Sequence, residues 1–225
     1  MRRFIRDNGI ALFFGAILIA SLVGQAIAGH AQYNNDQVAH GGGPVSFVDY
    51  ITSGSFAADV MENWQSEFLQ FSLFILATVW LVQRGSPESK KPGEEGRESD
   101  RAQRVGGWAG RGAPAPARRP GGLLRALYEN SLMLVMLSIW IGTWLAQSIA
   151  GHSAYNAQQL NQLQDPLSWL DYVGSADFWN RTLQNWQSEF LAIVSMVVFS
   201  IYLRQRGSPE SKPVGAPHTA TSVES

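Results

Sequence analysis

The chain has 225 residues, no cysteine, 45% hydrophobic residues and a formal net charge of −1. Without cysteine, these residues form no disulfide scaffold, no thiolate metal site, no thiol nucleophile and no lipid anchor attached through sulfur. Charged residues make up only 16%, against about 25% in a typical soluble protein, and their balance gives no overall argument for nucleic-acid binding.

Four segments along the chain predict helices that cross a membrane. The first covers residues 10–28 and the third covers residues 132–150; each has 19 residues and no charge, close to the ~20 that span a hydrocarbon core. The second and fourth are predicted at residues 64–83 and 186–204, where shorter apolar runs follow a first turn placed among lipid headgroups. The alternative for such short runs is a buried helix of a soluble protein. We therefore expect an all-α integral membrane protein with four transmembrane helices.

Basic residues predict how these helices are oriented. If the N-terminus lies inside, 16 of the 17 Lys and Arg residues face the cytoplasm and only Arg181 lies outside. The acidic residues divide evenly, nine on each side, so the outer face carries −8 and the inner face +7. This asymmetry follows the positive-inside rule. It predicts a multi-pass membrane protein with both termini in the cytoplasm.

Residues 1–28 also have features of a cleavable secretory signal. Basic residues precede an apolar stretch, and Ala26-Ile27-Ala28 before Gly29 fits a cleavage site. The apolar stretch is longer than the about 7–15 residues of most signals, and a similar small-residue pattern recurs internally before Gly151, where no signal could act. Retention of the first helix is therefore favoured, and cleavage is the alternative.

The chain contains an internal duplication. Residues 8–90 align with residues 130–212 at a constant offset of 122, with 34 identities in 83 positions and no gap. Residues 63–69 are identical to residues 185–191 (NWQSEFL), and residues 83–90 are identical to residues 205–212 (QRGSPESK). Each copy holds two crossings, so both enter the membrane from the same side as parallel helical hairpins, unlike the inverted repeats of many transporters.

The duplication sets the predicted domain boundaries. Repeat 1 covers residues 8–90 and repeat 2 covers residues 130–212. Between them, residues 91–121 are rich in Gly, Pro, Arg and Glu, a composition that predicts a disordered cytoplasmic linker. The tail at residues 213–225 is also predicted to be disordered.

Each outer loop, residues 29–63 and 151–185, is predicted to hold a short helix in the membrane interface. Asp165-Pro166 is typical of a helix start, and Ser55 and Asp177 are predicted to cap the long helices that follow and run to about Arg84 and Arg206. Aromatic residues at this depth are expected to anchor the chain among headgroups. The predicted anchors are Trp64, Trp186, Trp169, Tyr50 and Tyr172.

The candidate binding residues form a repeated polar set. Glu67 and Glu189 begin the second apolar run of each repeat, where a carboxylate is costly unless it faces protein, water or a ligand. Asn63 and Asn185 lie one helical turn earlier, and His30 and His152 end the preceding helices at a similar depth. Around one axis, these six residues could bind a divalent cation or relay protons. The interpretation that we favour is that they instead hold helices together.

The sequence gives no evidence of catalysis. It contains no nucleotide-binding loop, no dinucleotide fingerprint, no HExxH and no Gly-x-Ser-x-Gly. We therefore assign no catalytic residue, no cofactor and no definite metal site. The linker is basic but has few aromatic residues, so nucleic acid is not an expected partner.

The repeated GHxxYN, NWQSEF and RGSPESK segments resemble a bacterial family of two-repeat, four-helix membrane proteins known only as a domain of unknown function. The resemblance covers residues 8–212 and implies no activity and no site residues. Together with the predicted spans, it implies a location in the bacterial cytoplasmic (inner) membrane. The expected function is a non-enzymatic membrane component that packs helices and binds a partner or lipid. The alternative is a small oligomeric transporter or channel for cations or protons that uses the paired glutamates. The expected partners are the lipid bilayer and further copies of the chain; the sequence specifies no other protein.

Overall fold

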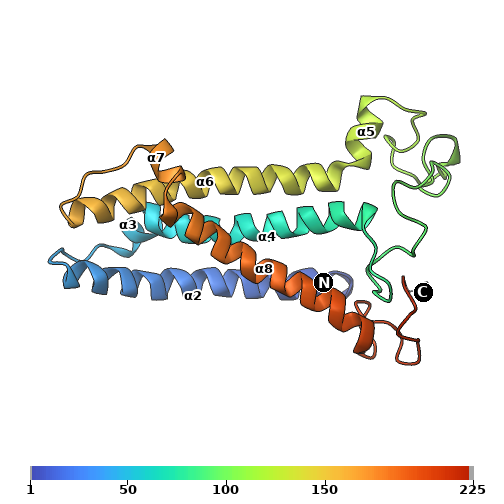
Figure 1. The fold of residues 1–225 in the computed structure, drawn as a ribbon, viewed down its shortest axis with the longest axis horizontal. Coiled ribbons are helices and arrows are strands. Elements are labelled where there is room, and N and C mark those ends of the chain that lie inside the picture. The colour runs from blue at the N-terminus through green and yellow to red at the C-terminus, as the bar shows by residue number, and fades with distance from the viewer. Residues whose placement is uncertain (1, 223–225) are drawn as a thin grey trace. The chain divides into compact units, whose positions relative to one another are not determined.

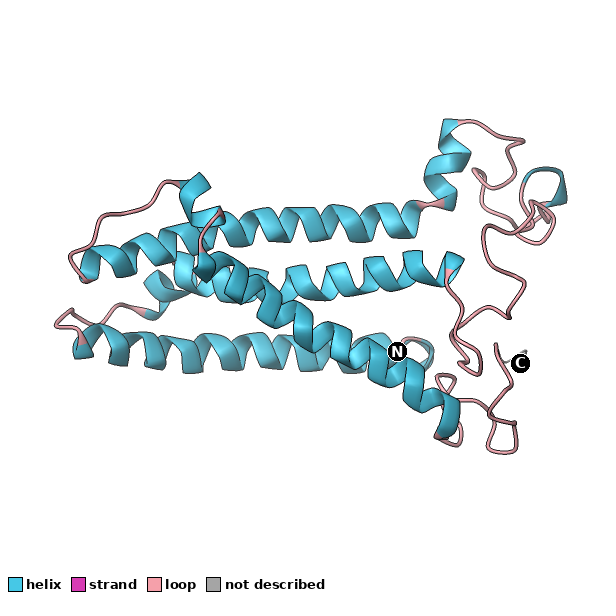
Figure 2. Ribbon diagram, viewed as in Figure 1, coloured by secondary structure: helices cyan, strands magenta, loops and turns pink. Residues whose placement is uncertain are grey.

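The computed structural model describes residues 2–222 and confirms the all-α class (Figures 1 and 2). No strand occurs in the described residues. The helices in chain order are α1 (Arg2–Asp7), α2 (Gly9–Ala39), α3 (Phe47–Ile51), α4 (Gly54–Trp80), the 3-10 helix η1 (Gly106–Trp108), α5 (Leu123–Glu129), α6 (Ser131–Asn161), α7 (Trp169–Val173) and α8 (Ala176–Tyr202).

Two of the described helices, α2 and α6, are long and apolar enough to cross a membrane. Each has 31 residues, which corresponds to about 46 Å at the rise of an α-helix. Among the described residues, α4 and α8 do not reach the same combination of length and apolar composition. The first and third predicted spans, residues 10–28 and 132–150, therefore lie on helices that are long and apolar enough to cross a membrane.

Both α2 and α6 run eleven residues past their predicted ends at residues 28 and 150. The prediction that His30 and His152 end these helices was wrong, because the polar residues that follow contain no Gly or Pro that would break a helix. Each helix instead ends in a Schellman motif. The backbone N–H of Gly42 donates to the carbonyl of Gln37 at 2.8 Å, and that of Gln164 donates to Gln159 at 2.8 Å.

Serine hydroxyls set the starts of the shorter elements. The Oγ of Ser168 accepts from the backbone N–H of Asp171 at 3.3 Å, and Ser46 does the same for Asp49 at 3.1 Å. Helix α7 therefore begins at Trp169, and the predicted start at Asp165-Pro166 was wrong. A capping serine paired with an acidic residue three positions later satisfies more groups than the isolated Asp-Pro signal.

The caps of the two long helices α4 and α8 are also serines. The backbone N–H of Phe56 lies 3.3 Å from the Oγ of Ser53, and that of Phe178 lies 3.3 Å from the Oγ of Ser175. The predicted caps, Ser55 and Asp177, were wrong because both residues already lie inside the helices.

Helices α4 and α8 end at Trp80 and Tyr202, four residues before the predicted ends. The identical QRGSPESK segments then form the same turn: the N–H of Gln83 donates to Ser89 Oγ and that of Gln205 donates to Ser211 Oγ, both at 2.8 Å. The glycine of each turn has a positive φ, 89° at Gly85 and 86° at Gly207, a conformation that favours glycine.

The chain divides into two units. The first unit comprises residues 1–61 and 145–178, and the second comprises residues 62–144 and 179–225. The first unit holds α2, α3 and α7, with α3 packed against α2. The second unit holds both NWQSEFL segments, both QRGSPESK turns, the linker and the tail.

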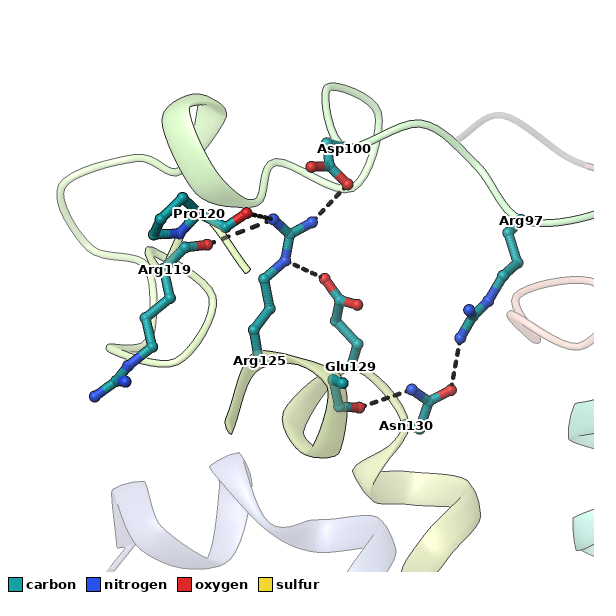
Figure 3. A network of polar contacts seen from close by, with 8 residues as sticks. Arg97, Asp100, Arg119, Pro120, Arg125, Glu129 and Asn130 are labelled. Carbon is teal, nitrogen blue, oxygen red and sulfur yellow. Dashed lines mark hydrogen bonds and ion pairs between the residues drawn. The ribbon is translucent and has the colours of Figure 1, made fainter. Parts of the chain in front are cut away.

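The linker at residues 91–121 has more local structure than its composition alone predicted. Arg125 of α5 has a side chain only 9% exposed and pairs with Asp100 and Glu129, both at 2.5 Å. The same guanidinium donates to the carbonyl of Pro120 at 3.0 Å (Figure 3). These two carboxylates raise the pKa of Arg125, so the guanidinium stays charged. One buried arginine therefore ties the linker to α5, directly before the second repeat.

The tail also makes contacts of its own as far as the structure describes it. The buried ammonium of Lys212 donates to the carbonyls of Gly85 at 2.5 Å and His218 at 2.9 Å. The backbone N–H of Gly85 donates to Thr221 Oγ1 at 2.8 Å. Residues 223–225 of the predicted disordered tail lie outside the described residues.

Candidate functional site

In the first unit, the loops that follow α2 and α6 (residues 40–46 and 162–168) are each bound to the preceding helix. The contacts come from a histidine and an asparagine one turn apart on that helix. The Nε2 of His30 lies 2.9 Å from the carbonyl of Val45, and the Nδ2 of Asn34 donates to the same carbonyl at 3.1 Å. The Oδ1 of Asn34 accepts from the backbone N–H of Val45 at 2.8 Å. The amide of Asn34 thus pairs with both backbone groups of one loop residue. We call this arrangement the loop clamp.

The second repeat builds the same loop clamp 122 residues later. His152 Nε2 lies 2.8 Å from the carbonyl of Leu167, and Asn156 Nδ2 donates to that carbonyl at 2.9 Å. The N–H of Leu167 donates to Asn156 Oδ1 at 2.9 Å. The contacted loop residue differs between repeats, Val45 against Leu167, because only its backbone is used.

A glycine and a tyrosine complete each loop clamp. A Cβ atom placed on Gly29 would lie 2.1 Å from the hydroxyl oxygen of Tyr50, and one on Gly151 would lie 2.4 Å from that of Tyr172. Both distances are far below van der Waals contact. Each tyrosine therefore reaches its helix only because glycine leaves the space for the phenol.

The two tyrosines are core residues of the loops. Tyr50 is 3% exposed and Tyr172 is 1% exposed. The ring of Tyr50 contacts Tyr33 and Phe56 with centroids 5.5 and 5.4 Å apart. The predicted role of Tyr50 and Tyr172 as headgroup anchors was wrong, because neither ring reaches the surface. Burial, followed by the negative charge of Asp59, raises the pKa of the Tyr50 hydroxyl.

The predicted tryptophan anchors lie nearer the surface. Trp64 is 37% exposed and Trp169 is 39% exposed. The Nε1 of Trp169 donates to Ser148 Oγ at 3.2 Å. Trp186 is half-buried. The exposed faces of Trp64 and Trp169 leave the anchor prediction open for these residues.

In the second unit, α8 meets α4 through polar side chains from the two identical segments. Trp186 Nε1 donates to Gln65 Oε1 at 2.9 Å, and Gln65 is fully buried. Glu189 Oε1 lies 3.4 Å from Ser66 Oγ. The Ser66 hydroxyl also donates to the carbonyl of Asn63 at the shorter distance of 2.8 Å, so its bond to Glu189 is the weaker of the two.

The six candidate residues do not share one set of hydrogen bonds. His30 and His152 are bound to their own loops in the first unit. In the second unit, Glu189 is half-buried beside Ser66 while Glu67 is exposed. Asn185 Nδ2 donates to the carbonyl of Arg181 in its own helix at 3.0 Å. In the described part of the chain, no three His, Asp or Glu side chains are grouped to hold a metal ion.

A family model matches residues 1–223 of the chain. The chain belongs to the family described as Domain of unknown function (DUF6766). The predicted membership of a family without known activity is thus confirmed, and the match extends beyond the predicted residues 8–212. No curated protein and no solved structure matches the chain.

In this DUF6766 chain, the sequence alone did not identify the residues that position the loops. The repeat alignment contained the signal: Gly29, Asn34 and Tyr50 are each identical to their partners in repeat 2. The spacing of four between His and Asn placed both on one helix face. The sequence could not identify the loop residues that the asparagines bind, because Val45 and Leu167 contribute only backbone atoms to these bonds.

Proposed function

We propose that the chain is a multi-pass protein of the bacterial inner membrane with four spans, both termini in the cytoplasm and a non-enzymatic, architectural role. The observation that supports this most directly is the apolar surface of α2. Ile10 is 76% exposed and Phe14 is 63% exposed. Large side chains exposed along a whole helix match a lipid environment rather than a water-facing surface.

The exposed residues of α4 and α8 support the second and fourth spans. Both helices have 27 residues, about 40 Å of helix, and carry large exposed apolar side chains toward their C-terminal ends. On α4 these are Phe71, Leu73, Leu76 and Trp80, and on α8 they are Leu191, Val194, Val198 and Phe199. With four spans, the 16 basic residues and the two QRGSPESK turns lie on the cytoplasmic side.

The architectural role is supported by how the polar residues are used. The histidine and asparagine of each loop clamp bind loop backbone, and Gln65 and Trp186 bind each other across two helices. Such bonds hold helices and loops in place and leave few polar groups to bind a ligand. The bilayer is the expected partner, together with further copies of the chain.

The second candidate is a transporter or channel for cations or protons, favoured by one observation. Glu189 of α8 is half-buried beside Ser66 of α4, the residue before Glu67. Two carboxylates near the outer end of membrane helices could pass protons or cations.

Replacing both glutamates with glutamine distinguishes the two candidates. In an architectural role, Glu67→Gln with Glu189→Gln keeps an acceptor oxygen for the Ser66 hydroxyl, so we expect a change in the thermal unfolding midpoint of less than about 3 °C. We also expect no cation or proton flux in proteoliposomes from either protein. Flux from the unsubstituted chain that the double variant loses, and that the exposed-site control Glu94→Gln keeps, would show that the transporter is correct.

A further inference from the structure

The two copies of NWQSEFL lie in different surroundings although their sequences are identical. On α4, Gln65, Ser66 and Leu69 are buried. The same positions of α8, Gln187, Ser188 and Leu191, are exposed. We call Gln65, Ser66 and Leu69, and their α8 counterparts, face A of each helix.

The tryptophan and the glutamate of the segment show the opposite difference, because they are exposed on α4 and half-buried on α8. On α8, Trp186 and Glu189 are half-buried and turned toward α4. On α4, Trp64 and Glu67 are exposed. We call these tryptophan and glutamate pairs face B of each helix.

The contact within the chain therefore joins face A of α4 to face B of α8. Trp186 Nε1 donates to Gln65 Oε1 at 2.9 Å, and Glu189 lies 3.4 Å from Ser66. The contact is heterologous, because it joins two different surfaces. Face A of α8 and face B of α4 are left over, and their residues are the same as those already in contact.

We infer that these two left-over faces bind each other between copies of the chain. In that contact Trp64 of one copy donates to Gln187 of the next, and Glu67 of one copy lies against Ser188 of the next. The inference rests on the proposed membrane embedding, which holds α4 and α8 of neighbouring copies in the same direction and plane. It requires no new chemistry, because face B of α4 and face A of α8 repeat the residues of the existing interface.

The residue types suit such a contact. Tryptophan is enriched at interfaces because its ring packs while its N–H keeps a hydrogen-bond partner. An amide and an indole at the outer end of a membrane helix gain from pairing with each other where water is scarce. Leu191, 63% exposed beside Gln187 and Ser188, adds apolar area to the same face.

The duplicated tryptophans give a matched pair of variants. Trp64→Phe removes the donor to the neighbouring copy, and we expect self-association in detergent or lipid discs to weaken about five-fold, the effect of one hydrogen bond. We expect the thermal unfolding midpoint of the single chain to stay unchanged. Trp186→Phe removes the donor within the chain, and we expect a lower unfolding midpoint. Equal effects of the two variants on self-association would overturn the inference.

Disulfide cross-linking in membranes tests the contact directly, because the chain has no cysteine of its own. Two differently tagged copies carry Glu67→Cys and Ser188→Cys, and we expect a mixed cross-linked pair on oxidation. The control pairs Glu67→Cys with Ile17→Cys, an exposed position on α2. Cross-linking no stronger than this control would disprove the contact. Resistance to alkaline carbonate extraction, measured on the same membranes, tests the embedding separately, so loss of embedding and loss of the contact give different results.

Discussion

Alanine at Gly29 is expected to lower the stability of the chain by about 1–3 kcal/mol, the usual cost of overpacking. The new Cβ would lie 2.1 Å from the hydroxyl oxygen of Tyr50 and 3.0 Å from its Cζ, so the phenol must leave its place. For a chain of this length the loss corresponds to a fall in the unfolding midpoint of roughly 3–10 °C. Thermal unfolding in detergent measures it. Gly151→Ala should behave in the same way against Tyr172.

The second repeat supplies the controls. A Cβ on Gly24 or Gly142 would have no atom within 4 Å, and alanine already stands at the equivalent positions, Ala146 and Ala20. Gly24→Ala and Gly142→Ala should therefore leave stability unchanged or raise it, because alanine favours the helix. Adding Tyr50→Phe to Gly29→Ala should recover part of the loss. If the Gly29→Ala variant is as stable as Gly24→Ala, the hydroxyl of Tyr50 does not lie close to Gly29.

We expect Asn34→Ala to release the loop after α2 (residues 40–46) from that helix. The substitution leaves the backbone N–H and carbonyl of Val45 without their amide partner, a loss of about 1–3 kcal/mol in the closed state of the loop. We therefore expect the amide of Val45 to exchange with solvent one to two orders of magnitude faster, by about tenfold per 1.4 kcal/mol. Hydrogen exchange of this peptide measures the effect, and Asn156→Ala should do the same at Leu167.

Asn35 provides the control beside it. This residue is exposed on the same helix, and Asn35→Ala makes the same change in helix propensity without touching Val45. Its exchange pattern should match the unsubstituted chain. Equal protection of Val45 in the Asn34→Ala and Asn35→Ala variants would show that the loop clamp does not hold the loop.

Much of the fold follows from the periodic and repeated parts of the sequence. The uncharged runs at residues 10–28 and 132–150 located the starts of α2 and α6 to within one residue. Helix ends were less predictable, because they depend on which of several local signals is satisfied. The cap formed by Ser168 with Asp171 sets the start of α7 in place of Asp165-Pro166, and residues 30–39 stayed helical because they contain no Gly or Pro.

The sequence predicted which polar residues belong to the candidate site, but not which groups they contact. Repetition identified His30, Asn63 and Glu67 as residues to examine, but the sequence could not show that His30 contacts a loop carbonyl. The burial of Tyr50 was missed because a tyrosine on a short helix near a membrane fits both an anchor and a core residue. The difference between Glu67 and Glu189 could not be seen in identical segments, since it arises from how α4 and α8 meet.

The central claim is that the chain crosses the membrane four times, and single cysteines in the cysteine-free chain test it most directly. Suitable positions are Gly43→Cys, Gly112→Cys, Gln164→Cys and Gly215→Cys. Four spans predict that a membrane-impermeant maleimide labels positions 43 and 164 in intact spheroplasts, and labels 112 and 215 only after permeabilisation. If only α2 and α6 crossed, positions 43 and 112 would be labelled and 164 and 215 protected, and that result would contradict the four-span arrangement.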